Sequence, residues 1–151
     1  MKDVIRYAGR MSKKSARIAA LIESCRGRAL DAHYLGYFEC FNQQLFYEAH
    51  DVLEELWLAS RRGPNYGFYK GLIQLAGAFV HLQKNRLRPA AALFKLSRSY
   101  LAPYPAVHES LELELVRALI VEWVGRLESA GFQTNPLEAL PPPQLFLIPS
   151  S

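Results

Sequence analysis

The 151-residue chain has little cysteine, and its two thiols, Cys25 and Cys40, form no Cys-x-x-C motif. This scarcity argues against a disulfide scaffold and against a zinc site built from thiolates. The chain also lacks an apolar run long enough to cross a bilayer, and no secretory signal peptide is recognisable. We therefore expect two free thiols, no membrane partner and a cytoplasmic location.

Sequence motifs that bind nucleotides or carry out hydrolysis are missing as well. The chain has no P-loop, no glycine-rich dinucleotide turn, no G-x-S-x-G and no H-E-x-x-H. Alternating strand patterns of useful length are also lacking, so a β-sheet fold is not expected. No cofactor is expected on these grounds, and a divalent metal is the alternative that the histidines and carboxylates leave open.

Long stretches of the chain lack charged residues of one sign. Residues 29–55 contain no Lys or Arg, and residues 56–108 contain no Asp or Glu. We favour the interpretation that acidic and basic helices pack beside one another. The alternative is a polyanion-binding face formed by residues 1–28 and 84–98, but no nucleic-acid motif is present and a nucleic-acid partner is not expected.

What the sequence does contain is helical periodicity, interrupted by short turns that hold Gly, Pro or Asn. The apolar spacing predicts six helices, over about 12–25, 31–41, 45–60, 66–84, 89–101 and 107–129. Short connections between helices imply antiparallel neighbours. The predicted fold class is all-α: a compact antiparallel bundle of about six helices with a Pro-rich, extended C-terminal tail.

Three regions follow from this pattern. Residues 1–30 form a basic N-terminal arm and helix, residues 31–131 form the helical bundle domain, and residues 132–151 form the Pro-rich tail. The tail ends in an apolar segment, which we expect to pack on the bundle or on a partner. A homo-oligomer through the long C-terminal helix or the tail is therefore an open alternative.

The third and fourth helices carry the candidate site, because each has a polar stripe at helical spacing. An antiparallel hairpin centred near Gly63 and Pro64 places Trp57 level with Lys70, and Glu54 level with Gln74. Gly77 then leaves room opposite His50. The predicted polar site comprises Tyr47, Glu48, His50, Asp51, Glu54, Trp57, Lys70, Gln74 and His81.

Three interpretations of this site compete. In the favoured one, Glu54 is ionised and accepts hydrogen bonds from Gln74, Lys70 or His50, in a buried structural network that fixes the helix register. In the second, His50, Glu54 and His81 bind a divalent metal. In the third, His50 is a general base oriented by Glu54, next to a pocket lined by Tyr47 and Trp57.

Several short motifs resemble domain-of-unknown-function family 309. They are Phe41-Asn42, Tyr47-Glu48-Ala49-His50-Asp51, Leu53-Glu54, Trp57, Lys70-Gly71-Leu72-Ile73-Gln74-Leu75-Ala76 and His81. The resemblance covers about residues 37–104 and implies a compact helical bundle of bacterial, archaeal or plastid type. It implies no reaction, because the family's function is unassigned.

The sequence therefore predicts an uncharacterised helical domain with a buried polar site between two antiparallel helices, either structural or binding a protein or small-molecule partner. One alternative is a small hydrolase-like or metal-dependent enzyme that uses His50 and Glu54. The other is the polyanion-binding protein described above.

Overall fold

The computed structural model describes residues 13–149 and confirms the all-α class. Within that range it contains seven helices and one two-stranded hairpin. In chain order the elements are α2 (Lys13–Ser24), α3 (Ala32–Asn42), α4 (Phe46–Ala59), α5 (Tyr66–Gln83), α6 (Leu87–Leu101), β1 (Val107–His108), β2 (Leu111–Glu112), α7 (Leu113–Ser129) and α8 (Pro136–Ala139).

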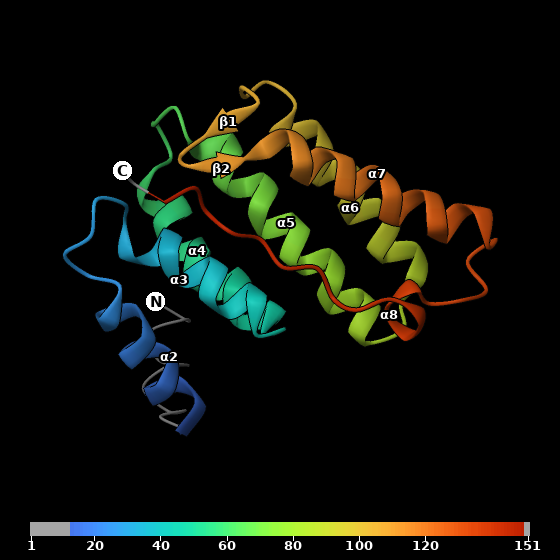
Figure 1. Ribbon diagram of the computed structural model, residues 1–151, viewed down its shortest axis with the longest axis horizontal. Coiled ribbons are helices and arrows are strands. Elements are labelled where there is room, and N and C mark those ends of the chain that lie inside the picture. Colours follow the sequence, from blue (N-terminus) through green and yellow to red (C-terminus); the bar gives the residue numbers. More distant parts are fainter. Residues whose placement is uncertain (1–12, 150–151) are drawn as a thin grey trace.

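Helix α5 is the centre of the bundle. It packs mainly against α4 on one side and α6 on the other, while α3 covers α4 and α7 covers α6 (Figure 1). Its Phe79 ring contacts aromatic rings of all four of these helices, namely Phe41, Phe46, Phe94 and Trp123. A helix that is apolar on nearly every side is stable only when it is surrounded in this way.

Helices α5 and α6 approach each other closely at Gly71. A Cβ at this position would lie 2.6 Å from Cγ of Leu101, so the contact requires glycine. Ser97 Oγ donates a hydrogen bond of 2.6 Å to the Gly71 carbonyl from the facing helix. Helix α6 begins at Leu87, two residues before the predicted start at Pro89.

The start of the last long helix was predicted wrongly. Helix α7 begins at Leu113, whereas the apolar spacing placed its start near Val107. Glu109 and Ser110 have φ angles of 48° and 59°, which a right-handed helix does not allow, and they form the turn between β1 and β2. His108, expected at the surface near a helix start, is instead half-buried, with its Nε2 2.7 Å from Asn65 Oδ1.

The C-terminal segment runs back across the bundle. After α8 it passes alongside α5 toward the end that carries β1 and β2 (Figure 1). Asn42 on α3 donates from Nδ2 to the Leu145 carbonyl at 2.8 Å and accepts from the Leu145 N–H at 2.7 Å. Further on, the Ile148 N–H donates to the Ser110 carbonyl at 2.7 Å. Of the two surfaces considered for the tail, the bundle is the one it contacts.

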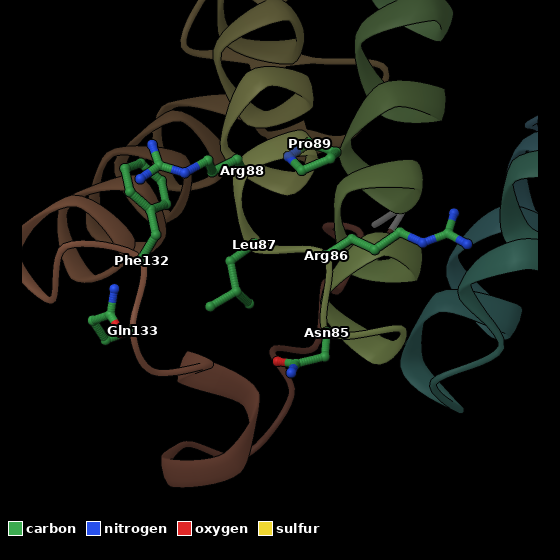
Figure 2. Close-up of a pocket in the computed structure, with 7 residues that line it drawn as sticks. All are labelled: Asn85, Arg86, Leu87, Arg88, Pro89, Phe132 and Gln133. Atoms are coloured by element: carbon green, nitrogen blue, oxygen red, sulfur yellow. The ribbon is translucent and has the colours of Figure 1, made fainter.

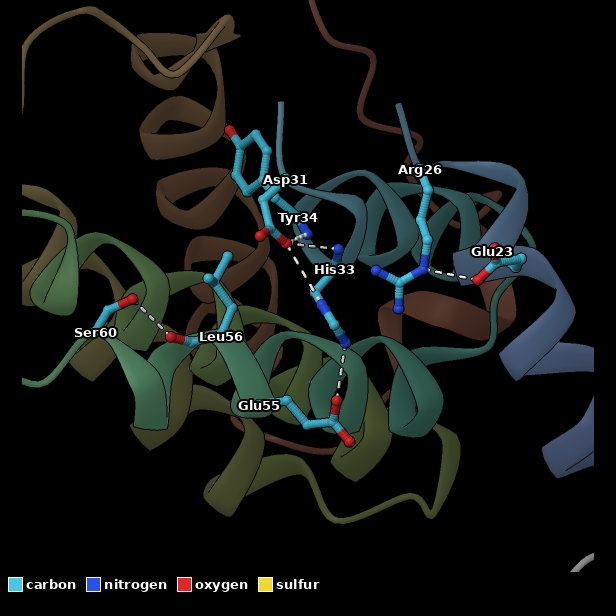
Figure 3. Close-up of polar contacts among 8 residues, drawn as sticks. All are labelled: Glu23, Arg26, Asp31, His33, Tyr34, Glu55, Leu56 and Ser60. Carbon is cyan, nitrogen blue, oxygen red and sulfur yellow. Dashed lines mark hydrogen bonds and ion pairs between the residues drawn. The ribbon is translucent and has the colours of Figure 1, made fainter. Parts of the chain in front are cut away.

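Helix α2 packs against α3, where Gly36 receives the side chains of Leu21 and Ile22. The basic arm predicted over residues 1–11 lies outside the described residues. Asp31 caps α3, accepting from the N–H groups of His33 and Tyr34 as predicted (Figure 3). His33 in turn joins α3 to α4, because its Nε2 lies 2.8 Å from Glu55 Oε2.

Both cysteines are free and buried, as expected. Burial raises the pKa of the Cys40 thiol to about 12, and nearby Glu48 adds to the increase, so this thiol is protonated at neutral pH. Within residues 13–149, the helices are too short or too polar to cross a bilayer.

Candidate functional site

The α4–α5 hairpin has the register that the sequence predicted. Lys70 Nζ lies 4.3 Å from the centroid of the Trp57 ring, which places these two residues level with each other. The Trp57 ring also packs against Tyr66, with centroids 5.2 Å apart, at the start of α5. These contacts fix the relative height of the two polar stripes.

A cavity of about 320 Å³ opens between α4 and α5, on the side of this contact that lies away from the turn joining the two helices. It contains five of the nine predicted site residues, and its remaining lining is apolar or glycine. The lining residues are Tyr47, His50, Lys70, Ile73, Gln74, Gly77, Val80, His81 and Leu93. Glu48, Asp51, Glu54 and Trp57, all on α4, lie outside this lining.

The site is half-open, not buried as predicted. Tyr47 at its rim is 53 % exposed, and the side chains of His50 and Glu54 are 32 % and 37 % exposed. The physical reason is that the buried face of α4 is formed by Phe46, Ala49, Val52 and Leu53, and the polar stripe lies at the edge of that face. Solvent and small solutes therefore reach the imidazole of His50.

Two polar atoms of the cavity residues are buried without a hydrogen-bond partner: Gln74 Oε1 and His81 Nδ1. Burial lowers the pKa of His81 below its usual value, and the neighbouring charges of Arg86 and Lys84 lower it further. At neutral pH the ring is therefore uncharged, with one nitrogen donating and one accepting. Partnerless buried polar atoms are rare and costly, so two in one cavity call for an explanation. A third such atom, Trp57 Nε1, lies on α4 outside the lining.

His50 contacts acidic residues of its own helix. Its Nδ1 lies 3.3 Å from Asp51 Oδ1, and its Nε2 lies 3.6 Å from Glu54 Oε2. The Tyr47 ring stacks on the imidazole, with centroids 6.2 Å apart. Asp51, a member of the predicted polar site, is half-buried and contacts His50.

The predicted sealed network is not the observed arrangement. Of the three proposed donors to Glu54, His50 is the one it pairs with, whereas Gln74 Oε1 has no partner and Lys70 sits over Trp57. Glu54 and Gln74 share a level of the hairpin without bonding across it. The histidine and the amide therefore belong to two separate polar groups, one on α4 and one on α5.

The metal ligands predicted from sequence are brought together only in part. Within residues 13–149, His50, Asp51 and Glu54 offer three ligand atoms that all lie within 4.8 Å of one another. His81, predicted as the third ligand, is not in this group, because it projects from the far end of α5. Asp51 takes the place of His81 in this group. Asp51 directly follows His50 in the sequence, and helical spacing does not predict a contact between adjacent residues.

Gly77 lines the same cavity as His50, in agreement with the room it was expected to leave there, and it has a second role. A Cβ on this residue would lie 3.1 Å from Leu93 Cδ1 of α6, so the glycine permits helix packing as well as lining the cavity. Leu93 itself was missed as a cavity residue. Its presence depends on how α6 lies on α5, which periodicity does not report.

A second cavity of about 410 Å³ lies at the turn between α5 and α6 (Figure 2). The Arg88 guanidinium lies over the Phe132 ring, 4.4 Å from its centroid, while the Arg86 side chain extends the opposite way, toward α4 (Figure 2). Lys95, in the same basic segment, pairs with Glu128 at 2.9 Å. Part of the basic segment 84–98 is thus engaged within the bundle, and polyanion binding stays a prediction.

Fold and site together define a small all-α bundle with a half-open polar cavity between two antiparallel helices. Residues 34–93 match the family described as a domain of unknown function (DUF309), so the predicted resemblance is confirmed over that range. The matched range runs from α3 into α6 and contains every residue that lines the α4–α5 cavity. No curated protein and no solved structure matches the chain.

Proposed function

We propose that this chain is a small-molecule-binding helical domain, and that the cavity between α4 and α5 is its binding site. The observation that carries the proposal is the pair of buried, partnerless atoms, Gln74 Oε1 and His81 Nδ1, in one cavity of about 320 Å³. Both residues line the cavity, so a ligand with a hydrogen-bond donor for Gln74 and a polar group for His81 would satisfy both atoms once a rotation of each side chain turns its buried atom toward the ligand.

The shape and lining of the cavity support this function. Small-molecule sites are concave and mostly apolar, with a few placed polar groups. Here Ile73, Val80 and Leu93 supply the apolar wall, and the amide and imidazole supply the polar groups. The half-open mouth beside Tyr47 gives a ligand access.

Substitution of Gln74 tests whether its amide serves binding or stability. If the amide is reserved for a ligand, Gln74→Met removes an unsatisfied acceptor and raises the free energy of unfolding by about 1 kcal/mol, measured by urea denaturation. If the amide were part of a structural network, the same change would lower stability. Gln43→Met, at an exposed position just after α3, is the matched control and should change stability little.

Binding itself is tested with ¹⁵N-labelled protein and a library of small fragments that carry hydroxyl or amide donors. We expect a subset to shift the Gln74 side-chain amide signals together with the backbone signals of Gly77 and His81. Gln74→Met and His81→Phe should each remove these shifts while Gln43→Met keeps them. A library that shifts none of these signals in the wild-type protein would overturn the proposal.

The second candidate function is a divalent-metal site on α4, favoured by the ligand atoms of His50, Asp51 and Glu54 that lie within 4.8 Å of one another. One imidazole nitrogen and carboxylate oxygens suit zinc or manganese, and open positions for water would allow metal-assisted hydrolysis.

Metal binding would be tested by equilibrium dialysis against zinc and manganese, followed by elemental analysis. This candidate predicts one equivalent of metal for the wild-type protein and much less for His50→Ala and for Glu54→Gln. The control is Glu55→Gln, the next residue on α4, which pairs with His33 and should keep the metal. Equal uptake by all four proteins would remove the candidate.

A further inference from the structure

We propose that the ligand of the α4–α5 cavity is a small organic anion, whose charged group is bound by Lys70 and whose other polar groups are bound by Gln74 and by His81. The inference rests on the proposed function and names the chemical class of its ligand, an apolar body that carries a carboxylate or phosphate.

Lys70 supplies a positive charge at the cavity. Its side chain lines the cavity, and its ammonium lies over the Trp57 ring, 4.3 Å from the centroid. The indole face attracts the cation and holds it in place, but it does not neutralise its charge. Among residues 13–149, no carboxylate oxygen lies within 4 Å of Lys70 Nζ.

The carboxylate that the sequence predicted as a partner of Lys70 is already engaged. Glu54 Oε2 pairs with His50 Nε2 at 3.6 Å, and Glu54 does not line the cavity. A half-buried cation without a carboxylate partner favours an anion from outside the chain.

The rest of the lining adds no acidic side chain. Seven of the nine lining residues come from α5 and α6, and residues 56–108 contain no Asp or Glu. The carboxylates of Asp51 and Glu54 on α4 lie outside the lining, beside His50. Lys70 is therefore the one charged side chain among the lining residues, and its positive charge favours an anion over a cation.

The apolar wall limits what kind of anion fits. Ile73, Val80 and Leu93 lie between Lys70 at one end and His81 at the other. An inorganic ion would leave this wall in contact with water, whereas an organic acid or a phosphate ester covers it and gains the hydrophobic contribution.

Matched probe pairs test the inference by titration of ¹⁵N-labelled full chain. The first pair is 4-hydroxybenzoate and its neutral amide, 4-hydroxybenzamide; the second is phenyl phosphate and phenol. We expect the anionic member of at least one pair to shift the cavity signals of Gln74 and Gly77 with a Kd at least about tenfold lower than its neutral partner.

Variants at Lys70 assign the charge recognition to this residue. Lys70→Gln should weaken the anionic probe about tenfold and leave the neutral probe unchanged, while Lys70→Arg keeps the preference. Lys95→Gln, whose lysine pairs with Glu128 on the far side of α6, is the matched control and should bind like wild type. Circular dichroism melts establish that each variant is folded, and Lys70→Met replaces Lys70→Gln if the latter does not fold.

The outcomes separate this inference from the proposed function. Neutral probes that bind in the cavity as tightly as anionic ones overturn the anion inference and leave the binding function in place. Cavity binding of the anion that is unchanged in Lys70→Gln overturns the role of Lys70. If neither these probes nor the fragment library shift the cavity signals, both proposals fail.

Discussion

His81 shows what a single residue contributes to this molecule. Its ring ends the polar stripe of α5, and its Nδ1 is buried without a partner while its backbone carbonyl accepts from the Arg86 N–H at 2.8 Å. The same residue therefore accepts a hydrogen bond at the end of α5 through its main chain, lines a cavity and carries a buried ring nitrogen without a partner. A group of this kind is kept at a cost to stability, which binding of a ligand would repay.

The pH dependence of stability should report the burial of His81. Burial, Arg86 and Lys84 lower the pKa of His81 in the folded state below the usual value of 6.5. As pH falls from about 6.5 through this lowered pKa, the unfolded chain binds a proton that the folded protein does not. The free energy of unfolding should therefore decrease over that window and be fully recovered above it.

Urea denaturation of the wild-type protein and His81→Gln, at a series of pH values from 5 to 8, measures this contribution. The variant should lose part of the decrease below pH 6.5, because its side chain does not titrate. Parallel curves for the two proteins would contradict the assignment.

The sequence predicted which residues form the site better than it predicted their hydrogen bonding. Helical spacing placed Lys70 opposite Trp57 and put Gln74 and His81 on one face, and the structure agrees. It could not tell that Gln74 and His81 lack partners, because hydrogen bonding depends on side-chain rotamers in three dimensions. It also missed Leu93 and the contact between Asp51 and His50, for which the sequence carried no periodic signal.

At the scale of elements, the helices agree with the prediction where caps and turns are strong. Asp31 caps α3 and the Gly63-Pro64 turn separates α4 from α5, so these boundaries were predicted to within about two residues. The start of α7 was wrong because its apolar spacing extends through Val107, while the chain turns at Glu109 and Ser110 with positive φ angles. A turn built by two non-glycine residues has little sequence signature.

Two helical glycines should respond to alanine in opposite directions. Gly71→Ala places a Cβ 2.6 Å from Leu101 at the α5–α6 contact, and should lower the free energy of unfolding by about 2 kcal/mol through overpacking. Gly125→Ala on α7 meets no atom within 4 Å, and should raise it by about 0.5–1 kcal/mol through helix propensity. Chemical denaturation of both variants measures the two effects, and a shared sign would refute this account of the α5–α6 packing.

At the scale of the whole molecule, the C-terminal segment joins parts of the chain that are far apart in sequence. It contacts α3 through Asn42 and the β1–β2 turn through Ser110, so it lies across the bundle from end to end (Figure 1). Sequence could not choose between the bundle and a partner for this segment, because its apolar side chains Leu145 and Leu147 and its main-chain hydrogen bonds would suit either surface.

Asn42→Ala should release this segment. The change removes both hydrogen bonds to Leu145 and should lower the free energy of unfolding by about 1–3 kcal/mol. Hydrogen exchange at the Leu145 amide should become much faster. The amides of α5 should keep their relative order of protection from exchange. Gln43→Ala, one residue further and exposed, is the control, and equal exchange at Leu145 in both variants would contradict the tether.

Asn42 recognises Leu145 through peptide groups alone, and this has a consequence for how the segment can change over generations. The neighbouring Phe146 is exposed, so its identity is free to drift while the docked path stays the same, whereas Gln144 adds a side-chain hydrogen bond of 3.3 Å from its Nε2 to the Asn42 carbonyl. Proline at 145 is the substitution this geometry forbids, because it has no N–H to offer the Asn42 side chain.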